Sequence, residues 1–311
     1  MLNYVHGGDI QTYIDRYGAA PLDLSANINP FGIPDAVRAA MHRAVDNCTQ
    51  YPDPFCRAVR QAIGAREGVN PDFLYCGNGA ADVLDRLAAV LKPRKVLLTA
   101  PTFAEYERTL SGAEIRVHNL REIVRKCTEN GVKLVVDECF NDFLTDAERH
   151  TRKDLLESNP GLIILRAYTK MYAVPGVRFG WCMTADAALI EKLYHAGQPW
   201  NVSIIAQACA AAAANEPDWA AETAKRIAEE RRFLSDGLAA CGLTVFPGEA
   251  NFLLFRSNDT GLHEKLAEHG IMIRNCDNYR GLSAGYYRVA VKTREASKCL
   301  LNAIKLIMEN G

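Results

Sequence analysis

Short apolar runs alternate with helical segments over residues 72–183. The run FLYC is followed by a helical pattern over residues 80–91, in which Val83, Leu84 and Leu87 fall on one face. Further apolar runs follow in the order KVLLTAP, EIRVHNL, KLVVDECF, LIILRAY and VRFGWCM. Continuous Val, Ile and Leu runs that alternate with helices are typical of a parallel sheet with helices on both faces. This part of the chain therefore predicts an α/β fold with three layers around a doubly wound, mostly parallel sheet.

The pattern changes after Trp200, where helices become longer. Helical spacing predicts helices over residues 204–214 and about 217–241. Strands and helices then alternate as TVFPGEANFLLFRS, HEKLAEHG, IMIRNC, YYRVAV and a closing helix over residues 295–308. This order is typical of a smaller α+β unit with antiparallel strands.

The length of the chain agrees with two domains. At about 150 residues for each domain, 311 residues suffice for both. We expect a large domain over residues 36–215 and a small C-terminal domain over residues 216–311. Residues 1–35 would form an N-terminal arm that packs on the small domain.

Composition narrows the class of partner. The 36 Lys and Arg residues and 37 Asp and Glu residues give a net charge of -1, without the basic character that nucleic-acid binding needs. The longest apolar run, over residues 206–214, is too short to span a membrane. Ten scattered cysteines without a C-x-x-C pair or a signal peptide predict free thiols in a cytoplasmic protein. We therefore expect a small-molecule partner.

No metal site is expected from the spacing of cysteines and histidines. The two histidines of HEKLAEH, His263 and His269, are six residues apart and do not share a helix face as a zinc pair would.

Two motifs place polar groups at the ends of predicted strands. The turn GNGAAD, residues 77–82, precedes a helix whose N-terminal N–H groups can bind phosphate, although an ordinary tight turn fits the motif equally well. Asp137 ends the run KLVVDECF, at the edge where open α/β sheets bind ligands. We expect this carboxylate to be buried and paired, while a structural cap is the alternative reading.

A third motif contains a lysine and an arginine. Lys170 follows the next apolar run, and Arg178 lies eight residues further on, after the turn at Pro175 and Gly176. A desolvated lysine can bind a carbonyl compound covalently and an arginine suits a phosphate, although the lysine alone would be read as a surface residue beside a β-turn. A phosphate turn, an aspartate, a lysine and an arginine at strand ends together indicate a site for pyridoxal phosphate.

The segment T-K-x-x-x-x-P-G-x-R-x-G over residues 169–180 resembles the lysine signature of the fold-type I aminotransferases. The resemblance covers nearly the whole chain and points to the histidinol-phosphate aminotransferase branch, closest to its threonine-phosphate decarboxylases of cobalamin biosynthesis. The motifs that carry it are HGGD at His6, SANINPFG at Ser25, YPDP at Tyr51, GNGAAD at Gly77, PTFAEY at Pro101, QPWNVS at Gln198, EANFLLFR at Glu249, IRNCDNYRGL at Ile273 and YYRVAV at Tyr286.

The resemblance implies pyridoxal phosphate as cofactor and a homodimer with shared active sites. Lys170 would hold the cofactor covalently and move protons, and Asp137 would face its ring nitrogen. Tyr106 would stack on the ring, and Tyr51 would reach the phosphate in the neighbouring subunit. The cofactor phosphate would be held by Gly79, Ala80, Ala81, Thr169 and Arg178. A packed core aromatic at Tyr106 and a surface aromatic at Tyr51 are the alternatives.

The resemblance also implies a site for a phosphorylated amino acid. Arg288 would bind the substrate carboxylate with its planar guanidinium. Arg274 would bind the substrate phosphate together with His6, and Gly7 and Asn27 would close over it. Without its HGGD context, His6 would be read as a terminal histidine with no role.

The chain departs from the family pattern at one junction, directly after Leu120, which we call the seam. A helix, a strand and an N-P-x-G loop are expected between EIRVHNL and KLVVDECF, but Leu120 is followed directly by REIVRKCTENG. Several tens of residues are absent, including an asparagine that should contact the phenolic oxygen of the cofactor. The missing strand would lie beside the strand of Asp137, so its loss would expose backbone donors and acceptors unless the neighbours pair again. A deletion, an omitted segment and a rearranged sheet are the alternatives.

Two single residues also depart from the pattern. Phe140 stands where aminotransferases often carry a tyrosine that contacts the cofactor oxygen, and the decarboxylases resemble the chain better there. Ala167 lacks a hydroxyl often found three residues before the lysine, which leaves more of the phosphate to Thr169 and Arg178.

The leading expectation is a decarboxylase that converts L-threonine O-3-phosphate to aminopropanol phosphate. An aminotransferase of histidinol phosphate or a related amino acid would use the same Lys170, Asp137 and Arg288, so these residues do not separate the two reactions. A non-catalytic protein with this fold is the third alternative, because of the missing segment.

Overall fold

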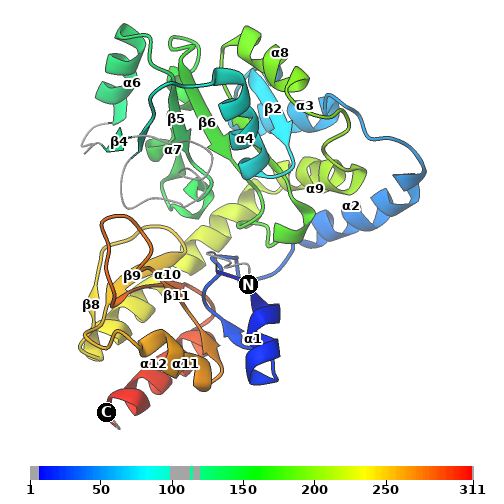
Figure 1. The fold of residues 1–311 in the computed structure, drawn as a ribbon. Helices are drawn as coiled ribbons and strands as arrows, with labels where there is room; N and C mark the ends of the chain where they lie inside the picture. Colours follow the sequence, from blue (N-terminus) through cyan, green and yellow to red (C-terminus); the bar gives the residue numbers. More distant parts are fainter. Residues whose placement is uncertain (1–6, 99–112, 115–119, 310–311) are drawn as a thin grey trace.

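The computed structural model describes residues 7–98, 113–114 and 120–309 (Figure 1). Among these residues, two four-stranded sheets account for most of the strands. We refer to the sheet with strand order β2-β7-β6-β5 as the first sheet, and to the sheet with order β11-β12-β9-β8 as the second sheet.

Three strands of the first sheet run in one direction, and β7 runs opposite to them. The strands are β2 (Leu74–Gly77), β7 (Gly180–Met183), β6 (Leu162–Arg166) and β5 (Leu134–Asp137). This arrangement agrees with the mostly parallel sheet that the apolar runs predict.

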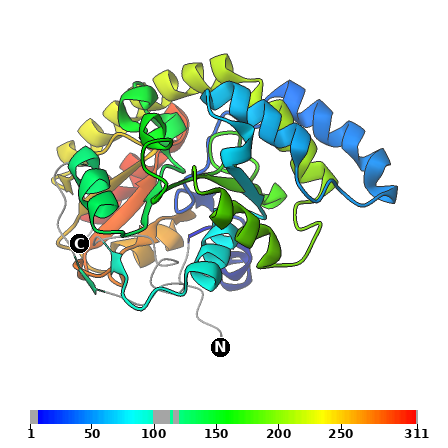
Figure 2. The same ribbon diagram turned by 90° about the horizontal axis from the view of Figure 1, so that it is seen from above.

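Helices cover both faces of the first sheet. In β6, Ile163 and Leu165 pack with α4 and α8, whereas Leu162 and Ile164 face the side of α2, α3 and α9. Figure 2 shows α4 in cyan and α8 in green on one side of the sheet, and the blue helices α2 and α3 on the other. These helices are α2 (Asp35–Val45), α3 (Arg57–Glu67), α4 (Ala80–Leu91), α8 (Ala187–His195) and α9 (Ile204–Ala214). The predicted three-layer fold is therefore confirmed.

Strand β5 lies at the edge of the first sheet. Among the described residues it pairs only with β6, while β3 (Leu97–Leu98) and β4 (Ala113–Glu114) form a separate parallel pair. The first three residues of β5 are half-buried and the last is exposed, whereas every residue of β2, β6 and β7 is buried. This edge agrees with the loss of a strand beside β5.

The second sheet is antiparallel throughout. Its strands are β8 (Thr244–Val245), β9 (Phe252–Arg256), β11 (Arg274–Asn275) and β12 (Tyr286–Ala290). The helices beside it are α10 (Pro217–Ala240), α11 (Leu262–Glu268) and α12 (Arg294–Glu309). Helix α10 runs between the two sheets and packs on α12 at its C-terminal end (Figure 1).

Two runs expected as single strands are each split in two. TVFPGEANFLLFRS forms β8 and β9, which are joined by a loop over residues 246–251 and pair with each other. IMIRNC forms β10 (Ile271–Met272) and β11, because β10 pairs with the N-terminal strand β1 whereas β11 pairs with β12.

The N-terminal segment joins both parts of the molecule. Helix α1 (Ile10–Tyr17) is followed by β1 (Leu22–Asp23), which pairs with β10 in parallel. Further on, the Asn29 N–H donates to the Lys170 carbonyl at 3.1 Å, and its side chain donates to the Met171 carbonyl at 2.7 Å. The division into an arm, a large domain and a small domain stays a prediction.

The remaining described elements are short or lie near the seam. They are α6 (Leu120–Glu129), α7 (Ala147–His150) and the 3-10 helices η1 (Asp46–Thr49), η2 (Pro71–Phe73), η3 (Asn141–Phe143), η4 (Lys153–Leu155) and η5 (Pro175–Val177). Within the described ranges, no helix has the length and apolar character that crossing a membrane requires.

Candidate active site

The GNGAAD turn brings the N-terminus of α4 beside Arg178. Gly79 has φ +90°, and a Cβ atom there would lie 2.7 Å from Arg178 Nη2. A Cβ atom on Gly180 would lie 2.4 Å from the Ala80 nitrogen, so only glycine lets β7 approach the start of α4. The first N–H groups of a helix lack intrahelical partners and favour anions. Together with the guanidinium they form an anion site of the kind that binds phosphate.

Asp82 holds this turn in place, a role that the GNGAAD motif alone does not indicate. One carboxylate oxygen accepts from the Asn78 N–H at 3.0 Å and from Asn201 Nδ2 at 2.7 Å. The other accepts from Arg86 Nε at 3.1 Å. The motifs GNGAAD and QPWNVS contain Asp82 and Asn201, but their spacing in the sequence does not reveal that the two side chains meet.

Thr169 and Lys170 lie just beyond the end of β6. The Thr169 side chain is buried, and its Oγ1 has no hydrogen-bond partner among the described residues. The Lys170 side chain is half-buried, with Nζ 5.6 Å from the centre of the Phe140 ring. A buried hydroxyl without a partner is costly, and a phosphate oxygen would satisfy it.

Asp137 is exposed, which corrects the expectation of a buried carboxylate. It is the last residue of β5, whose outer edge has no strand partner among the described residues. Its Oδ1 accepts from the Cys139 N–H at 2.8 Å. A carboxylate at an open sheet edge keeps access to water, whereas the expectation assumed strands on both sides.

Cys139 lies within reach of both Asp137 and Lys170. Burial raises the pKa of the Cys139 thiol well above its ordinary value, the Asp137 carboxylate raises it further, and the Lys170 ammonium opposes both. Asp137 contacts the Cys139 N–H and Lys170 lies over the ring of the next residue, Phe140, so both side chains lie against the same short segment.

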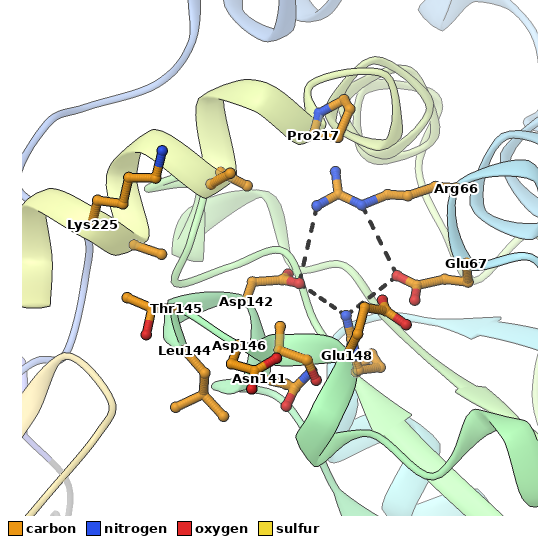
Figure 3. Close-up of a pocket in the computed structure, with 15 residues that line it drawn as sticks. Arg66, Glu67, Asn141, Asp142, Leu144, Thr145, Asp146, Glu148, Pro217 and Lys225 are labelled. Carbon is orange, nitrogen blue, oxygen red and sulfur yellow. Dashed lines mark hydrogen bonds and ion pairs between the residues drawn. The ribbon is translucent and has the colours of Figure 1, made fainter.

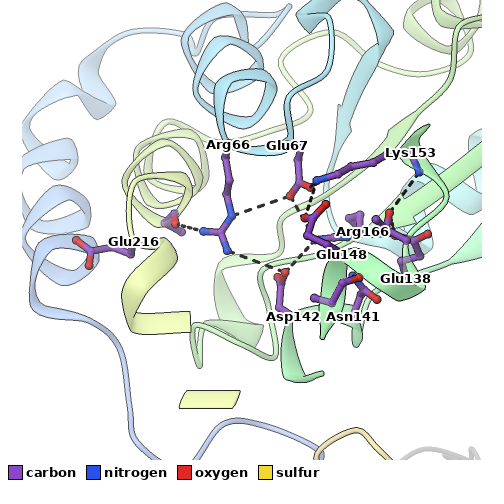
Figure 4. Close-up of polar contacts among 12 residues, drawn as sticks. Arg66, Glu67, Glu138, Asn141, Asp142, Glu148, Lys153, Arg166 and Glu216 are labelled. Carbon is purple, nitrogen blue, oxygen red and sulfur yellow. Dashed lines mark hydrogen bonds and ion pairs between the residues drawn. The ribbon is translucent and has the colours of Figure 1, made fainter. Parts of the chain in front are cut away.

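A buried charge network fixes the segment that follows Asp137 (Figure 4). Glu138 accepts from Arg166 Nη1 at 3.1 Å and from Thr151 Oγ1 at 2.8 Å. Arg166 Nη2 also contacts Asp142 at 2.9 Å and Glu67 at 3.3 Å. Burial lowers the pKa of Arg166, but the three carboxylates outweigh it and raise that pKa, so the guanidinium stays charged.

A cavity of about 370 Å³ lies beside this network and against α10 (Figure 3). Arg66 and Asp142 line one side, and Ala220, Ala224 and Lys225 of α10 line the other. None of the predicted site residues lines it. This cavity is therefore separate from the candidate active site.

Two arginines lie opposite each other in the second sheet. Arg274 of β11 and Arg288 of β12 are register partners, so their side chains leave the sheet on the same face. Arg288 Nη2 donates to the Ser25 carbonyl at 3.1 Å, and its buried Nε has no partner among the described residues. Arg274 Nη2 donates to Asn278 Oδ1 at 2.8 Å. Two guanidinium groups on one face have the chemistry to bind an anionic ligand.

Gly7 and Arg288 both lie against Ser25, and Asn27 follows two residues later in the chain. A Cβ atom on Gly7 would lie 2.5 Å from the Ser25 carbonyl oxygen, which also accepts from Arg288. The Asn27 side chain is buried and its Oδ1 has no partner in the described chain, while its carbonyl accepts from Asn251 Nδ2 at 2.9 Å. His6 and Tyr106 lie outside the described residues.

An aromatic pair connects the lysine to the second sheet. Phe140, next to Lys170, packs edge-on against Phe252 of β9, with ring centres 5.3 Å apart. The Arg288 guanidinium lies 5.6 Å from the centre of the Phe252 ring. The candidate site therefore extends from the α4 turn and Lys170 to the arginine pair.

Tyr51 lies apart from this group. Its side chain is 77% exposed and stacks on Trp200, with ring centres 4.5 Å apart. No hydrogen bond, ion pair or ring contact within the described chain joins Tyr51 to Lys170. Within the described residues, Tyr51 therefore contacts Trp200 and not Lys170.

Residues 19–121 and 111–304 match the profile of the family "Aminotransferase class I and II". The chain belongs to this family. It is 31% identical to the threonine-phosphate decarboxylase of Salmonella typhimurium, over 99% of the chain and 98% of that protein. It is 27% identical to the histidinol-phosphate aminotransferase of Nitratidesulfovibrio vulgaris, over 99% of the chain and 94% of that protein. The aminotransferase family thus includes relatives of both kinds.

A solved aminotransferase structure shares the fold. The histidinol-phosphate aminotransferase from Clostridium acetobutylicum superimposes with a TM-score of 0.86 at 24% identity, covering 93% of this chain and 99% of that one. Its similarity identifies the fold as that of the fold-type I aminotransferases.

The comparisons also locate the missing segment of this aminotransferase-family chain. The two stretches that match the family overlap at residues 111–121 instead of continuing one another. The alignment with the Salmonella decarboxylase runs over 357 positions, although this chain has 311 residues, so several tens of positions have no counterpart. The interruption coincides with the departure recognised after Leu120.

The cofactor of this aminotransferase family is pyridoxal phosphate, and the residues of the site fit it. The unpartnered Thr169 Oγ1, Arg178 and the start of α4 would hold its phosphate, with Lys170 at its aldehyde and Asp137 toward its ring nitrogen. When bound, the cofactor supplies an electron sink for bonds broken at the α-carbon of an amino acid. Fewer residues than expected would contact the cofactor ring. Asp137 lies on a strand at the sheet edge, and the N-P-x-G loop with its asparagine is absent from the sequence.

Proposed function

We propose that the protein is a pyridoxal-phosphate-dependent decarboxylase of L-threonine O-3-phosphate. In this reaction the bond between the α-carbon and the carboxylate breaks, carbon dioxide leaves, and a proton replaces it, which gives aminopropanol phosphate. The observation that carries the proposal is the register pair of Arg274 and Arg288 on one face of the second sheet. The 31% identity to a threonine-phosphate decarboxylase supports it.

The arginine pair suits a substrate with two anionic groups. Like charges directly opposite each other on neighbouring strands repel, so a ligand that neutralises both stabilises the pair. Arg288 binds the carboxylate, and its unpartnered Nε is available for a second, parallel hydrogen bond. Arg274, with His6, binds the phosphate, and Gly7 and Asn27 close the N-terminal segment over the substrate.

Lys170 delivers the proton in this reaction. Its Nζ lies against the Phe140 ring, which joins Phe252 and Arg288 in one continuous set of contacts. Arg274 and Arg288 would hold the substrate at its two ends and so fix the orientation of its α-carbon. A decarboxylase presents the carboxylate bond, whereas an aminotransferase presents the C–H bond.

The second candidate is an aminotransferase of histidinol phosphate. The 27% identity to such an enzyme and the shared lysine, aspartate and arginine favour it. To separate the two reactions, we would incubate the protein and pyridoxal phosphate with threonine phosphate and measure carbon dioxide and aminopropanol phosphate. Histidinol phosphate with 2-oxoglutarate, followed by glutamate formation, is the matched assay, and Lys170→Ala is the control without covalent cofactor.

The outcomes discriminate between the candidates. Carbon dioxide release from threonine phosphate, but not from threonine, supports the decarboxylase. Glutamate formation without carbon dioxide supports the aminotransferase. A borohydride-sensitive visible absorbance that neither substrate changes would indicate the non-catalytic alternative.

The proposed enzyme is a homodimer with shared sites, in which Tyr51 reaches the cofactor phosphate of the partner subunit. The exposure of Tyr51 and its lack of contact with Lys170 in its own subunit support this assignment. Mixing Lys170→Ala protomers with Tyr51→Ala protomers tests it, because one site of each mixed dimer then has both residues. We expect that site to regain wild-type cofactor affinity, and no recovery would contradict the shared site.

The proposed location is the cytoplasm. All ten cysteines are free thiols, as expected for a protein in a reducing compartment.

A further inference from the structure

Trp200 has a backbone conformation that its side chain disfavours. Its φ is +55°, a region that bulky residues rarely adopt and that glycine or asparagine adopts more easily. Trp200 is 45% exposed, so burial compensates for this conformation only in part. A strained residue that is only partly buried points to a functional role.

The ring of Trp200 holds Tyr51. The two ring centres are 4.5 Å apart and the planes are inclined by 26°, which is a stacked arrangement. Tyr51 has no hydrogen bond or other ring contact in the described chain, and 77% of it is exposed. An exposed tyrosine without this contact would sample several rotamers, and stacking restricts it to fewer.

The segments that carry both rings are fixed to the candidate site. Asn201, the residue after Trp200, donates to Asp82 at 2.7 Å, and Asp82 holds the phosphate turn. Gln207 Nε2 donates to the Asp53 carbonyl at 2.8 Å and to the Val202 carbonyl at 3.0 Å, which ties the Tyr51 loop to the Trp200 loop. The phosphate turn of one subunit thus sets the position of an aromatic pair at its surface.

We propose that Trp200 is a positioning residue that holds Tyr51 in the orientation in which it reaches the cofactor phosphate of the partner subunit. The inference rests on the shared site proposed above. By ordering Tyr51 before the cofactor binds, the stack lowers the conformational entropy lost on binding. The phosphate turn of one subunit therefore contributes, through Asp82, Asn201 and Trp200, to cofactor binding in the other.

Variants of Trp200 separate the ring from the backbone. Trp200→Asn keeps a residue that tolerates positive φ but removes the ring, and Trp200→Phe keeps a ring that can stack. Phe55→Ala is the matched control, because Phe55 is a neighbouring aromatic that is 42% exposed and packs on Tyr194 instead of Tyr51. We expect Trp200→Asn to weaken cofactor binding about tenfold, the order of one hydrogen bond to a charged group. Trp200→Phe and Phe55→Ala should stay close to wild type.

Mixed dimers show whether Trp200 acts through Tyr51. Lys170→Ala protomers and Tyr51→Ala protomers, with different tags, form dimers whose single competent site combines Lys170 of one subunit with Tyr51 of the other. Borohydride fixes the cofactor only where Lys170 is present, so fixed cofactor measured against its concentration gives the affinity of that site. Trp200→Asn is added to one protomer or the other.

The expected result depends on which protomer carries Trp200→Asn. In the Lys170→Ala protomer, which supplies the working Tyr51, Trp200→Asn should weaken cofactor binding about tenfold. In the Tyr51→Ala protomer it should change nothing. Equal effects in both placements, or an effect only in the second, would overturn the inference, because a merely structural role acts on the site of its own subunit. If mixed dimers of Lys170→Ala and Tyr51→Ala protomers, without a substitution at Trp200, do not regain cofactor affinity, the shared site itself is contradicted.

Discussion

At the scale of residues, the site depends on positions where one side chain decides whether two segments can meet. Gly79 lets Arg178 lie against the start of α4, and Gly180 lets β7 approach Ala80. The sequence identified these glycines through their motifs. It gave no role to Asp82, because the two partners of Asp82 outside its helix are a neighbouring turn amide and an asparagine 119 residues away.

Gly79→Ala tests this contact. The substitution adds a methyl group 2.7 Å from Arg178 Nη2 at a residue with φ +90°. We expect cofactor affinity to fall at least tenfold and unfolding free energy to fall by about 1–2 kcal/mol, the usual cost of a left-handed conformation for a residue with a Cβ. Cofactor titration and thermal unfolding measure the two effects.

Gly176→Ala is the control for that substitution. A Cβ atom there would meet nothing within 4 Å, and its φ is not positive. Both measurements should therefore stay near wild type. A Gly79→Ala protein that binds the cofactor as the control does would show that the α4 turn does not hold the phosphate.

At the scale of elements, regular helices and buried strands follow from the sequence, and short paired strands do not. The periodic pattern over residues 80–91 and 204–214 predicts α4 and α9 with their observed ends. The run IMIRNC does not reveal that β10 and β11 pair with different partners, because pairing is decided by segments distant in the sequence. The exposure of Asp137 has the same origin, since it depends on which strand lies beside β5.

Asp186 provides a test at this scale, because it caps α8 and joins it to the start of β5. Its carboxylate accepts from the Leu189 N–H at 3.0 Å and pairs with Lys133 at 2.7 Å. Burial raises the pKa of Asp186, but the hydrogen bonds from Lys133 and Leu189 outweigh burial and lower it below its ordinary value. The ionised form therefore stabilises the fold.

The sign of the pH dependence follows from this lowered pKa. The contribution is complete above the ordinary pKa of an aspartate, about 4, and is lost as the pH falls through the lower folded value. Asp186→Ala should cost about 1 kcal/mol at pH 7, and the difference from wild type should shrink below about pH 4. Denaturant unfolding at several pH values measures it.

Asp218→Ala is the control for the cap. Asp218 is an exposed acidic residue in the first turn of α10 and is not the residue that caps this helix. Its substitution should have a small effect that varies little with pH. A cost for Asp186→Ala that stays constant down to pH 3 would contradict the role of its charge.

At the scale of the whole molecule, the chain lacks several tens of positions that its decarboxylase relative has, and its first sheet ends at β5 within the described residues. Family membership and layer order follow from the motifs, which lie on both sides of the seam. The sequence does not reveal how the strands beside the missing one are paired, because they can pair with each other or stay apart. The described residues show them apart, with β3 and β4 in their own pair and β5 at an edge.

Hydrogen exchange tests this arrangement. Backbone amides of an edge strand open more easily than those of a strand paired on both sides. The Leu134 and Glu138 amides donate to carbonyls just before and within β6, so the Val135 amide points to the open edge, and we expect it to exchange much faster than the amides of Ile163 and Ile164 in β6. Equal protection in the two strands would mean that another strand completes the sheet beside β5.

The central claim is that the arginine pair and Lys170 serve a decarboxylase. The most direct measurement is the release of labelled carbon dioxide from carboxyl-labelled L-threonine O-3-phosphate by the protein loaded with pyridoxal phosphate. The account predicts one carbon dioxide for each aminopropanol phosphate formed, abolished in Lys170→Ala and reduced in Arg288→Gln. Absence of carbon dioxide, while the loaded protein transfers the amino group of histidinol phosphate to 2-oxoglutarate, would contradict it.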